Sequence, residues 1–327
     1  MKKVQNIDNV VMPEKLRQIL MQLNTIPVEV LEKMTLQEKR DAYERFALTH
    51  GGPLLSITRI EDTEVLSPEG HKIRIRIYTP CFGKILPVLM YIHGGGWIRG
   101  SLSTHDSICR RLANIGNCLV VSLEWRLAPE QPFPAGFYDA QAVYSWIIHN
   151  IKSYSGDTKR IAIGGDSAGA NLAASLTNFL KNAGLQLPCF QLLIYPCVSL
   201  KMQTPSYQEF TKGFLLTSDY VKNCIEAYIR DKKDLDNPQV NPILEANFSG
   251  LPPTHIVTAE YDPLRDEGKL YFEYIQKANV PSTYMCATQM VHAFLHLTGS
   301  VREAEDYATN IGETLRKNLY STDIKTG

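Results

Sequence analysis

The feature that most constrains the fold is an alternation of short apolar runs with longer helix-forming stretches. The apolar runs are continuous and lie at 88–92, 119–123, 161–164, 191–195, 255–259 and 283–287. Runs of this kind are typical of strands buried on both faces of a sheet. The stretches between them, at 106–115, 135–149, 168–183 and 266–278, are long enough for crossover helices. The pattern predicts a doubly wound, mostly parallel α/β sheet.

Two other patterns precede these runs. At 73–77 isoleucine alternates with arginine, which predicts a half-exposed antiparallel strand near an edge of the sheet. Residues 1–50 are charged and carry apolar side chains at helical spacing, at Leu16, Ile19, Leu20 and Leu23 and then at Val30, Leu31, Met34 and Leu36. This spacing predicts amphipathic helices that form a lid or an appendage.

The alternation is interrupted once, between Pro196 and Pro253. About two helices' worth of polar and aromatic sequence lies there before the next apolar run. A long insertion beside a parallel sheet usually serves function, so we expect a cap over the site.

A candidate nucleophile lies where the apolar run at 161–164 meets a helical stretch. Residues 161–169 read IAIGGDSAG, which places G-x-S-x-G around Ser167. Between a strand and a helix, this pattern is typical of a tight turn that presents a reactive serine. Glycines two residues away on either side avoid a clash, and the helix N-terminus favours developing negative charge. The spacing of these glycines excludes the dinucleotide-binding pattern G-x-G-x-x-G.

A glycine-rich turn follows the apolar run at 88–92, where residues 93–97 read HGGGW. Glycines at a strand end allow backbone amides to point at the oxygen of a tetrahedral intermediate. We predict that the amides of Gly95, Gly96 and Ala168 form this oxyanion hole. His93 is expected to brace the loop with its ring, and Trp97 to line the pocket.

Where G-x-S-x-G lies between a strand and a helix of an α/β sheet, the general base follows the nucleophile in the chain, so only histidines after Ser167 are candidates. His292 follows the last apolar run, at the strand end where ligands bind in open α/β sheets. His255 lies inside a run and is expected to be structural, and His296 is expected to begin the next turn of helix. We therefore predict His292 as the base.

The acid that orients the base should also lie at the carboxyl end of a strand. Asp262 follows the run at 255–259 and is the predicted acid. Asp266 and Glu267 are expected instead to begin the next helix. Asp166 is a weaker candidate, because it is expected to point away from Ser167 and to pin the loop by hydrogen bonds.

Five motifs together resemble the hormone-sensitive-lipase family of esterases, the bacterial type IV lipolytic enzymes. They are HGGGW, EWRLAPEQPFPA (124–135), GDSAGANLA, DPLRDEG and the terminal HAF, and the likeness runs from about residue 57 to the C-terminus. The resemblance implies an α/β-hydrolase fold with a mostly parallel eight-stranded sheet and a helical cap. It implies a serine hydrolase that cleaves carboxylic esters of short to medium acyl chains through an acyl-enzyme, without metal or organic cofactor. Carried over to this chain, its catalytic residues are Ser167, Asp262 and His292, and its oxyanion donors are Gly95, Gly96 and Ala168.

The resemblance also implies a division of the chain into core and cap. Residues 1–50 are assigned to the N-terminal part of the cap, 51–196 to the first part of the core, 197–240 to the cap insertion and 241–327 to the second part of the core. Candidate substrate-binding residues are Trp97 and, in the insertion, Phe210, Phe214, Leu215 and Leu216. Within the segment that resembles the family's RLAPE motif, Arg126 and Glu130 are expected to pair.

Composition limits the partners. The chain has 34 Lys and Arg against 34 Asp and Glu, so its formal net charge is 0. This balance disfavours nucleic acid and anionic lipid, and it favours a small neutral ester as substrate. Seven scattered Cys predict neither a disulfide framework nor a zinc site. The N-terminus lacks an apolar leader and no apolar run is long enough to span a bilayer, so we expect a cytoplasmic protein without stable membrane insertion.

Several alternatives remain open from the sequence. The same residues could cleave amides or thioesters, as in an amidase, a deacetylase or a thioesterase. A non-catalytic binding protein on this fold is disfavoured, because such proteins replace the base and His292 is present. A homodimer through a sheet edge occurs in the family, and nothing in the sequence decides it.

Overall fold

The computed structural model describes residues 6–321 and is built on one eight-stranded sheet. The strands are Arg59–Leu66 (β1), Lys72–Thr79 (β2), Leu86–Ile92 (β3), Leu119–Glu124 (β4), Gly156–Asp166 (β5), Phe190–Ile194 (β6), Thr254–Tyr261 (β7) and Ser282–Val291 (β8). They lie in the order β1-β2-β4-β3-β5-β6-β7-β8. β2 is antiparallel to β1 and β4, and the other neighbouring pairs are parallel. The mostly parallel sheet predicted from the apolar runs is confirmed.

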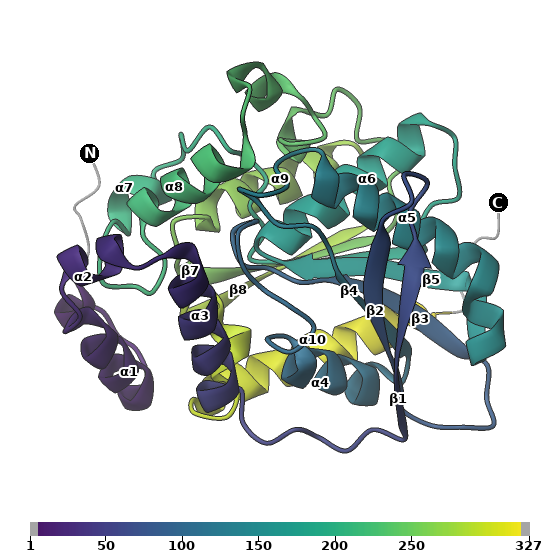
Figure 1. Cartoon of the computed structure of the whole chain (residues 1–327), viewed down its shortest axis with the longest axis horizontal. Coiled ribbons are helices and arrows are strands. Elements are labelled where there is room, and N and C mark those ends of the chain that lie inside the picture. The colour runs from purple at the N-terminus through teal and green to yellow at the C-terminus, as the bar shows by residue number, and fades with distance from the viewer. Residues whose placement is uncertain (1–5, 322–327) are drawn as a thin grey trace.

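Helices cover both faces of the sheet and one of its ends. They are Glu14–Asn24 (α1), Val28–Lys33 (α2), Leu36–His50 (α3), Asp106–Gly116 (α4), Ala135–Asn150 (α5), Ala168–Asn182 (α6), Ser206–Glu209 (α7), Ser218–Tyr228 (α8), Arg265–Lys277 (α9) and Arg302–Leu319 (α10). α4 and α10 lie on one face, and α5, α6 and α9 lie on the other (Figure 1). α1 to α3, α7 and α8 lie at the end of the sheet where the parallel strands finish (Figure 1).

The central strands face two hydrophobic cores. On β3, Val88, Met90 and Ile92 belong to the core shared with α5 and α6, whereas Leu89 and Tyr91 belong to the core shared with α4 and α10. Successive side chains of a strand point to opposite faces, so a strand covered on both sides must be apolar throughout. This burial explains why the central strands were visible in the sequence as continuous apolar runs.

The N-terminal segment differs from the expected pair of amphipathic helices. Thr35 and Glu38 form a capping box, in which the Thr35 amide donates to Glu38 Oε2 (2.7 Å) and the Glu38 amide donates to Thr35 Oγ1 (3.2 Å). A capping box begins a new helix, so the second apolar pattern is divided between α2 and α3. Val30 and Leu31 of α2 are 51% and 42% exposed, and the predicted apolar face is therefore not buried there.

The expected pairing of Arg126 with Glu130 is wrong. Arg126 pairs with Asp139 of α5 (Nη2 to Oδ1, 2.9 Å), because this fully buried carboxylate requires a cation. Glu130 pairs instead with Arg40 of α3 at 2.8 Å. Arg40 Nε also donates to the carbonyl of Ile98 at 2.8 Å. These contacts tie α3 to the loop that follows β3.

No helix among residues 6–321 combines the length and the apolar character that crossing a membrane requires.

Candidate active site

Ser167 lies in a strained turn between β5 and α6. Its φ of 55° falls in the left-handed region that residues other than glycine rarely occupy. The neighbouring glycines are required by the close approach of the end of β3. A Cβ on Gly165 would lie 2.3 Å from the carbonyl oxygen of Ile92, and one on Gly169 would lie 2.0 Å from the same oxygen. The turn that G-x-S-x-G predicted is therefore fixed by packing as well as by local conformation.

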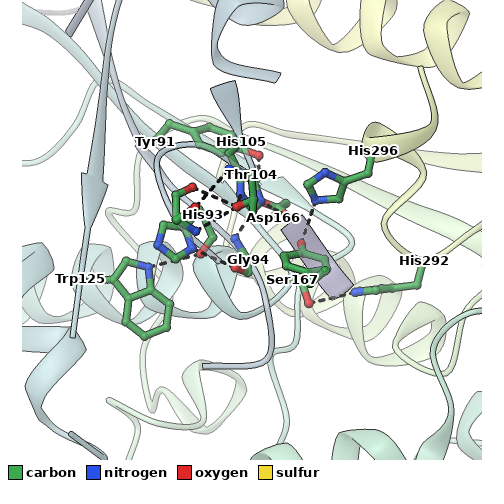
Figure 2. Close-up of polar contacts among 12 residues, drawn as sticks. Tyr91, His93, Gly94, Thr104, His105, Trp125, Asp166, Ser167, His292 and His296 are labelled. Atoms are coloured by element: carbon green, nitrogen blue, oxygen red, sulfur yellow. Dashed lines mark hydrogen bonds and ion pairs between the residues drawn. The ribbon is translucent and has the colours of Figure 1, made fainter. Parts of the chain in front are cut away.

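Ser167, His292 and Asp262 form a continuous chain of hydrogen bonds. His292 Nε2 lies 2.9 Å from Ser167 Oγ, and His292 Nδ1 lies 2.7 Å from Asp262 Oδ2. Figure 2 shows the imidazole of His292 directed at the serine hydroxyl. Asp262 is fully buried, and its other oxygen, Oδ1, accepts a hydrogen bond from the amide of Leu264 at 2.9 Å. The structure thus brings the three predicted side chains together, each beyond or near the carboxyl end of a different strand.

Three backbone amides beside the serine donate to no acceptor within residues 6–321. They belong to Gly95, Gly96 and Ala168. Gly95 and Gly96 have φ values of 125° and 64°, a region that glycine enters at little cost. Both line the same pocket as Ser167, and Ala168 follows the serine directly at the start of α6. Amides placed in this way are suited to stabilise an oxyanion.

A second polar network holds the HGGGW loop against the turn (Figure 2). Asp166 Oδ1 accepts hydrogen bonds from the amide of Gly94 (2.9 Å) and from the hydroxyl of Tyr91 (2.8 Å), and it lies 3.2 Å from Nε2 of His105. Burial opposes ionisation of Asp166, but His105 and the hydrogen-bond donors hold the pKa of the carboxyl below its usual range. Asp166 therefore pins the loop, as the sequence suggested, and forms no hydrogen bond with His292.

His93 supports the loop from behind. Its ring stacks on Trp125 with a centroid distance of 5.2 Å, and its Nδ1 lies 2.9 Å from the carbonyl oxygen of Gly94. Burial, and then the neighbouring His105, lowers the pKa of His93 to about 3. The imidazole is consequently neutral at neutral pH, which suits a structural ring.

Among the described residues, one group of side chains has the spacing that a metal ion would need. It consists of His105, Asp166 and His296, whose ligand atoms lie within 4.8 Å of one another. These side chains are already connected to protein groups. His296 Nε2 lies 2.8 Å from the hydroxyl of Tyr43, and His105 Nδ1 lies 2.8 Å from Oγ1 of Thr104. We therefore assign the cluster to the scaffold behind the serine.

A narrow pocket with a volume of about 50 Å³ contains Ser167 and His292. Its walls come from the loop after β3, from α3 and from α8, and they include Tyr43, Trp97, Arg99, Leu216, Tyr220 and Cys224. The Trp97 ring stacks almost parallel on Tyr228 at a centroid distance of 4.8 Å, which fixes its position in the wall. Trp97 and Leu216 thus lie in the wall of the pocket that contains Ser167.

The other candidates for substrate binding lie elsewhere. Phe210 and Phe214 do not line the pocket, because they pack on each other and on Tyr261, with centroid distances of 5.3 to 6.0 Å. Leu215 is partly buried in the same core. Aromatic side chains of an inserted segment have packed against the domain here, so their presence near the site did not identify the lining.

A second cavity, of about 460 Å³, lies over the ends of β7 and β8 and is bordered by Phe210. Arg265 lines this cavity, and its guanidinium is paired with Glu209 and Asp266 at 2.8 Å each. None of the three hydrogen-bonded residues of the site lines this cavity. The larger cavity is therefore separate from Ser167, His292 and Asp262.

The remaining acid candidates hold the insertion in place. Asp266 Oδ2 accepts a hydrogen bond from the amide of Ser206 at 3.0 Å. Glu267 is fully buried and accepts from the amides of Val198 (2.8 Å) and Ser199 (3.2 Å) and from the hydroxyl of Tyr207 (2.9 Å). Both carboxyl groups thus fasten the segment after β6 to α9.

Replacing Glu267 with glutamine is expected to reduce the dependence of stability on pH. Burial raises the pKa of this carboxyl from 4.5 to about 8. Between these values the unfolded chain releases a proton that the folded protein keeps, so the free energy of unfolding falls by about 1.4 kcal/mol per pH unit for this group. The contribution is fully present below about pH 4.5 and is lost as the pH rises through about 8.

Urea unfolding followed by tryptophan fluorescence, from about pH 5 to about pH 7.5, measures this effect. Over that range we expect the free energy of unfolding to fall by at least about 2 kcal/mol more in the wild type than in Glu267→Gln. Equal slopes of unfolding free energy against pH in the two proteins would contradict a raised pKa at Glu267.

Comparison with known proteins places the chain in a family. A family model described as the alpha/beta hydrolase fold matches residues 89–296, and the chain therefore belongs to the α/β hydrolases. The chain is 37% identical over 249 residues to an arylesterase of Saccharolobus solfataricus, which covers 76% of this chain and 80% of the relative. It is also 37% identical over 273 residues to carboxylesterase NlhH of Mycobacterium tuberculosis, covering 82% and 85% of the two chains.

Solved structures give the same result. An esterase of Pyrobaculum calidifontis superposes with a TM-score of 0.87 at 34% identity and covers 95% of this chain and 100% of its own. A thermostable esterase of Pseudomonas putida superposes with a TM-score of 0.89 at 28% identity and covers 95% and 98%. The esterase resemblance that the motifs predicted is confirmed by these relatives.

Sequence reasoning missed several residues of the pocket, among them Tyr43, Arg99 and Tyr220. A signal existed only for Arg99, which is a lone cation two residues after HGGGW in a loop of glycine and apolar residues. Tyr43 and Tyr220 come from segments far apart in the chain, and their meeting depends on how α3 and α8 pack.

Proposed function

We propose that this protein is a carboxylesterase that cleaves small esters through Ser167, His292 and Asp262. The observation that carries the proposal is the unbroken hydrogen-bond chain from the serine hydroxyl through the imidazole to a buried carboxylate, next to three amides that find no acceptor in the described part of the chain. The named esterases among the relatives support the same reaction.

The first half of the reaction forms an acyl-enzyme. His292 Nε2 takes the proton of Ser167 Oγ while Oγ bonds to the ester carbonyl carbon, and the carbonyl oxygen becomes an oxyanion. The amides of Gly95, Gly96 and Ala168 donate to that oxygen. The bond to the alcohol oxygen then breaks, and the proton held on Nε2 passes to the leaving alkoxide.

The second half returns the enzyme. A water molecule gives a proton to His292 Nε2 as its oxygen bonds to the acyl carbon, and the oxyanion forms again at the same amides. The bond between that carbon and Ser167 Oγ breaks, and the proton returns to the serine. Asp262 keeps the proton of the imidazole on Nδ1 and stabilises its cation, so that Nε2 is free to accept.

We also propose that residues 6–50 and 197–240 together form a cap that selects the substrate; residues 1–5 of the predicted segment 1–50 lie outside the described residues. Tyr43 comes from the first segment and Leu216 and Tyr220 from the second, and all three line the pocket of Ser167. The ion pair of Arg40 with Glu130 and the bonds accepted by Glu267 attach the two segments to the core.

The narrow pocket favours short acyl groups over longer ones. A cavity needs roughly 10–15 Å³ to hold one water molecule, so a pocket of about 50 Å³ holds about four groups of that size. Among p-nitrophenyl esters we expect kcat/KM to be highest for acetate to butyrate and to fall at least about tenfold by octanoate. An optimum at octanoate or longer would contradict the proposed pocket, and absence of any hydrolysis would contradict the esterase.

Matched variants test which residue limits the length of the acyl chain, and matched substrates test which bond is cleaved. Leu216→Ala should move the optimum toward longer chains, whereas Leu215→Ala, whose side chain lies outside the pocket, should leave the profile unchanged. An acetamide and a thioacetate with the same aryl group, assayed in parallel, distinguish the esterase from an amidase or a thioesterase. We expect the ester to have the highest kcat/KM relative to its rate with hydroxide.

A further inference from the structure

Arg99 is a cation placed inside the pocket of the nucleophile. Its side chain lines the pocket that contains Ser167, Gly95 and Gly96. Its amide donates to the carbonyl of Gly95 at 3.2 Å, so the residue is held one tight turn from the amides beside the serine. Its position is therefore set by the same loop that supplies those amides.

The guanidinium lies between two aromatic rings. Its central carbon is 4.3 Å from the ring centroid of Tyr43 and 4.7 Å from that of Tyr220. These rings come from α3 and α8, the two segments assigned to the cap. These cation–π contacts place the charge over the ring faces, and they supply no oxygen or nitrogen acceptor for the N–H groups of the guanidinium.

No carboxylate balances this cation within residues 6–321. The side chain of Arg99 takes part in no ion pair or side-chain hydrogen bond there, and its Nε is buried without an acceptor. Asp166 also lines the pocket, but it forms no ion pair with Arg99: its Oδ1 accepts from Gly94 and Tyr91, and its Oδ2 lies 3.4 Å from Nε2 of His105. A partly buried guanidinium whose Nε has no acceptor loses hydration without a compensating anion, which makes an anion from outside the chain the natural complement.

We propose that Arg99 binds a carboxylate on the substrate, so that the preferred substrates are short esters that carry one negative charge. This inference rests on the proposed esterase function and names its substrate class. The fork of N–H donors matches the two oxygens of a carboxylate, and charge-assisted hydrogen bonds to it would form in the pocket that also contains Ser167. The proposal departs from the neutral ester that the balanced net charge had suggested, because a local cation outweighs the average of the whole chain.

A purely structural role for Arg99 is the competing explanation. As a bridge between Tyr43 and Tyr220 it would hold α3 and α8 together without contacting the substrate. Loss of that bridge would lower activity on all esters to a similar extent. The ratio of activities on charged and neutral esters therefore separates the two roles, since general damage cancels in it.

The test compares two pairs of esters of equal length. Methyl hydrogen succinate, with a carboxylate on the acyl side, is paired with methyl 4-oxopentanoate. Acetoxyacetate, with a carboxylate on the alcohol side, is paired with acetoxyacetone. Hydrolysis is followed by pH-stat, and each kcat/KM is divided by the rate constant of the same ester with hydroxide. The proteins are the wild type, Arg99→Gln, Arg99→Lys and the control Arg45→Gln, which removes an exposed arginine of α3.

In the wild type we expect a charged-to-neutral ratio of at least about ten in one of the two pairs, and that pair identifies the side on which the carboxylate is bound. Arg99→Gln should bring the ratio to about one or below, Arg99→Lys should retain part of it, and Arg45→Gln should retain all of it. A wild-type ratio of one or less in both pairs overturns the proposal, as does a high ratio that Arg99→Gln leaves unchanged. If the wild type hydrolyses neither these esters nor p-nitrophenyl acetate, the esterase function itself fails, and this inference fails with it.

Discussion

The Ser167→Ala variant is expected to fold normally and to lose kcat/KM for p-nitrophenyl acetate by at least about 10⁴-fold, because no other group can form the acyl-enzyme. The substitution removes one oxygen from a partly enclosed pocket and leaves the packing of Gly165 and Gly169 against β3 intact. The amides beside the serine remain and can still stabilise an oxyanion, so a small residual rate above that of water is consistent with the mechanism.

Ser175→Ala is the matched control for this variant. Ser175 is buried on the same helix, α6, and its hydroxyl has no hydrogen-bond partner among residues 6–321. Its removal should change kcat/KM by less than about twofold. Comparable activity in Ser167→Ala and in the wild type, with both proteins purified to the same standard, would show that Ser167 is not the nucleophile.

The parts of the molecule that the sequence revealed are those where local pattern and packing make the same demand. Each strand between β3 and β7 is covered by helices on both faces, and its run of apolar residues reports that burial directly. The turn at Ser167 needs glycine at 165 and 169 because the carbonyl of Ile92 approaches within clashing distance of any added Cβ. A pattern that only one backbone arrangement satisfies can be recognised without the structure.

The parts that the sequence did not reveal depend on contacts between distant segments. Phe210 and Phe214 have the apolar character of pocket residues, yet Tyr261 offers them a partner outside the pocket. Buried Asp139 requires a cation and pairs with Arg126, so Glu130 pairs with Arg40 instead. No rule of sequence spacing contains this requirement. The lining of the pocket was therefore the least predictable feature, while the meeting of Ser167, His292 and Asp262 was the most predictable.

Asp262→Asn should be the second most damaging substitution, with kcat lowered by about 10⁴-fold while the fold is kept. The physical reason lies in the amide of Leu264, which donates to Oδ1 of Asp262 at 2.9 Å. In the variant, the Leu264 amide keeps the carbonyl oxygen of the asparagine in the position of Oδ1. The NH₂ group then takes the position of Oδ2, which in the wild type lies 2.7 Å from Nδ1 of His292. An NH₂ group can only donate there, and the imidazole must then carry its proton on Nε2, which can no longer accept the proton of Ser167.

The measurement is kcat for p-nitrophenyl acetate at about pH 8, together with a two-dimensional NMR spectrum of the imidazole nitrogens, which reports the tautomer directly. We expect the proton on Nδ1 in the wild type and on Nε2 in Asp262→Asn. The exposed Asp236→Asn, which alters one surface ion pair with Lys201, should show wild-type kcat and the wild-type tautomer. Retention of more than about a tenth of the wild-type kcat in Asp262→Asn would mean that the orientation of His292 does not depend on this carboxylate. The loss should be in kcat more than in KM, because Asp262 is fully buried behind the imidazole and acts on the transition state only through it.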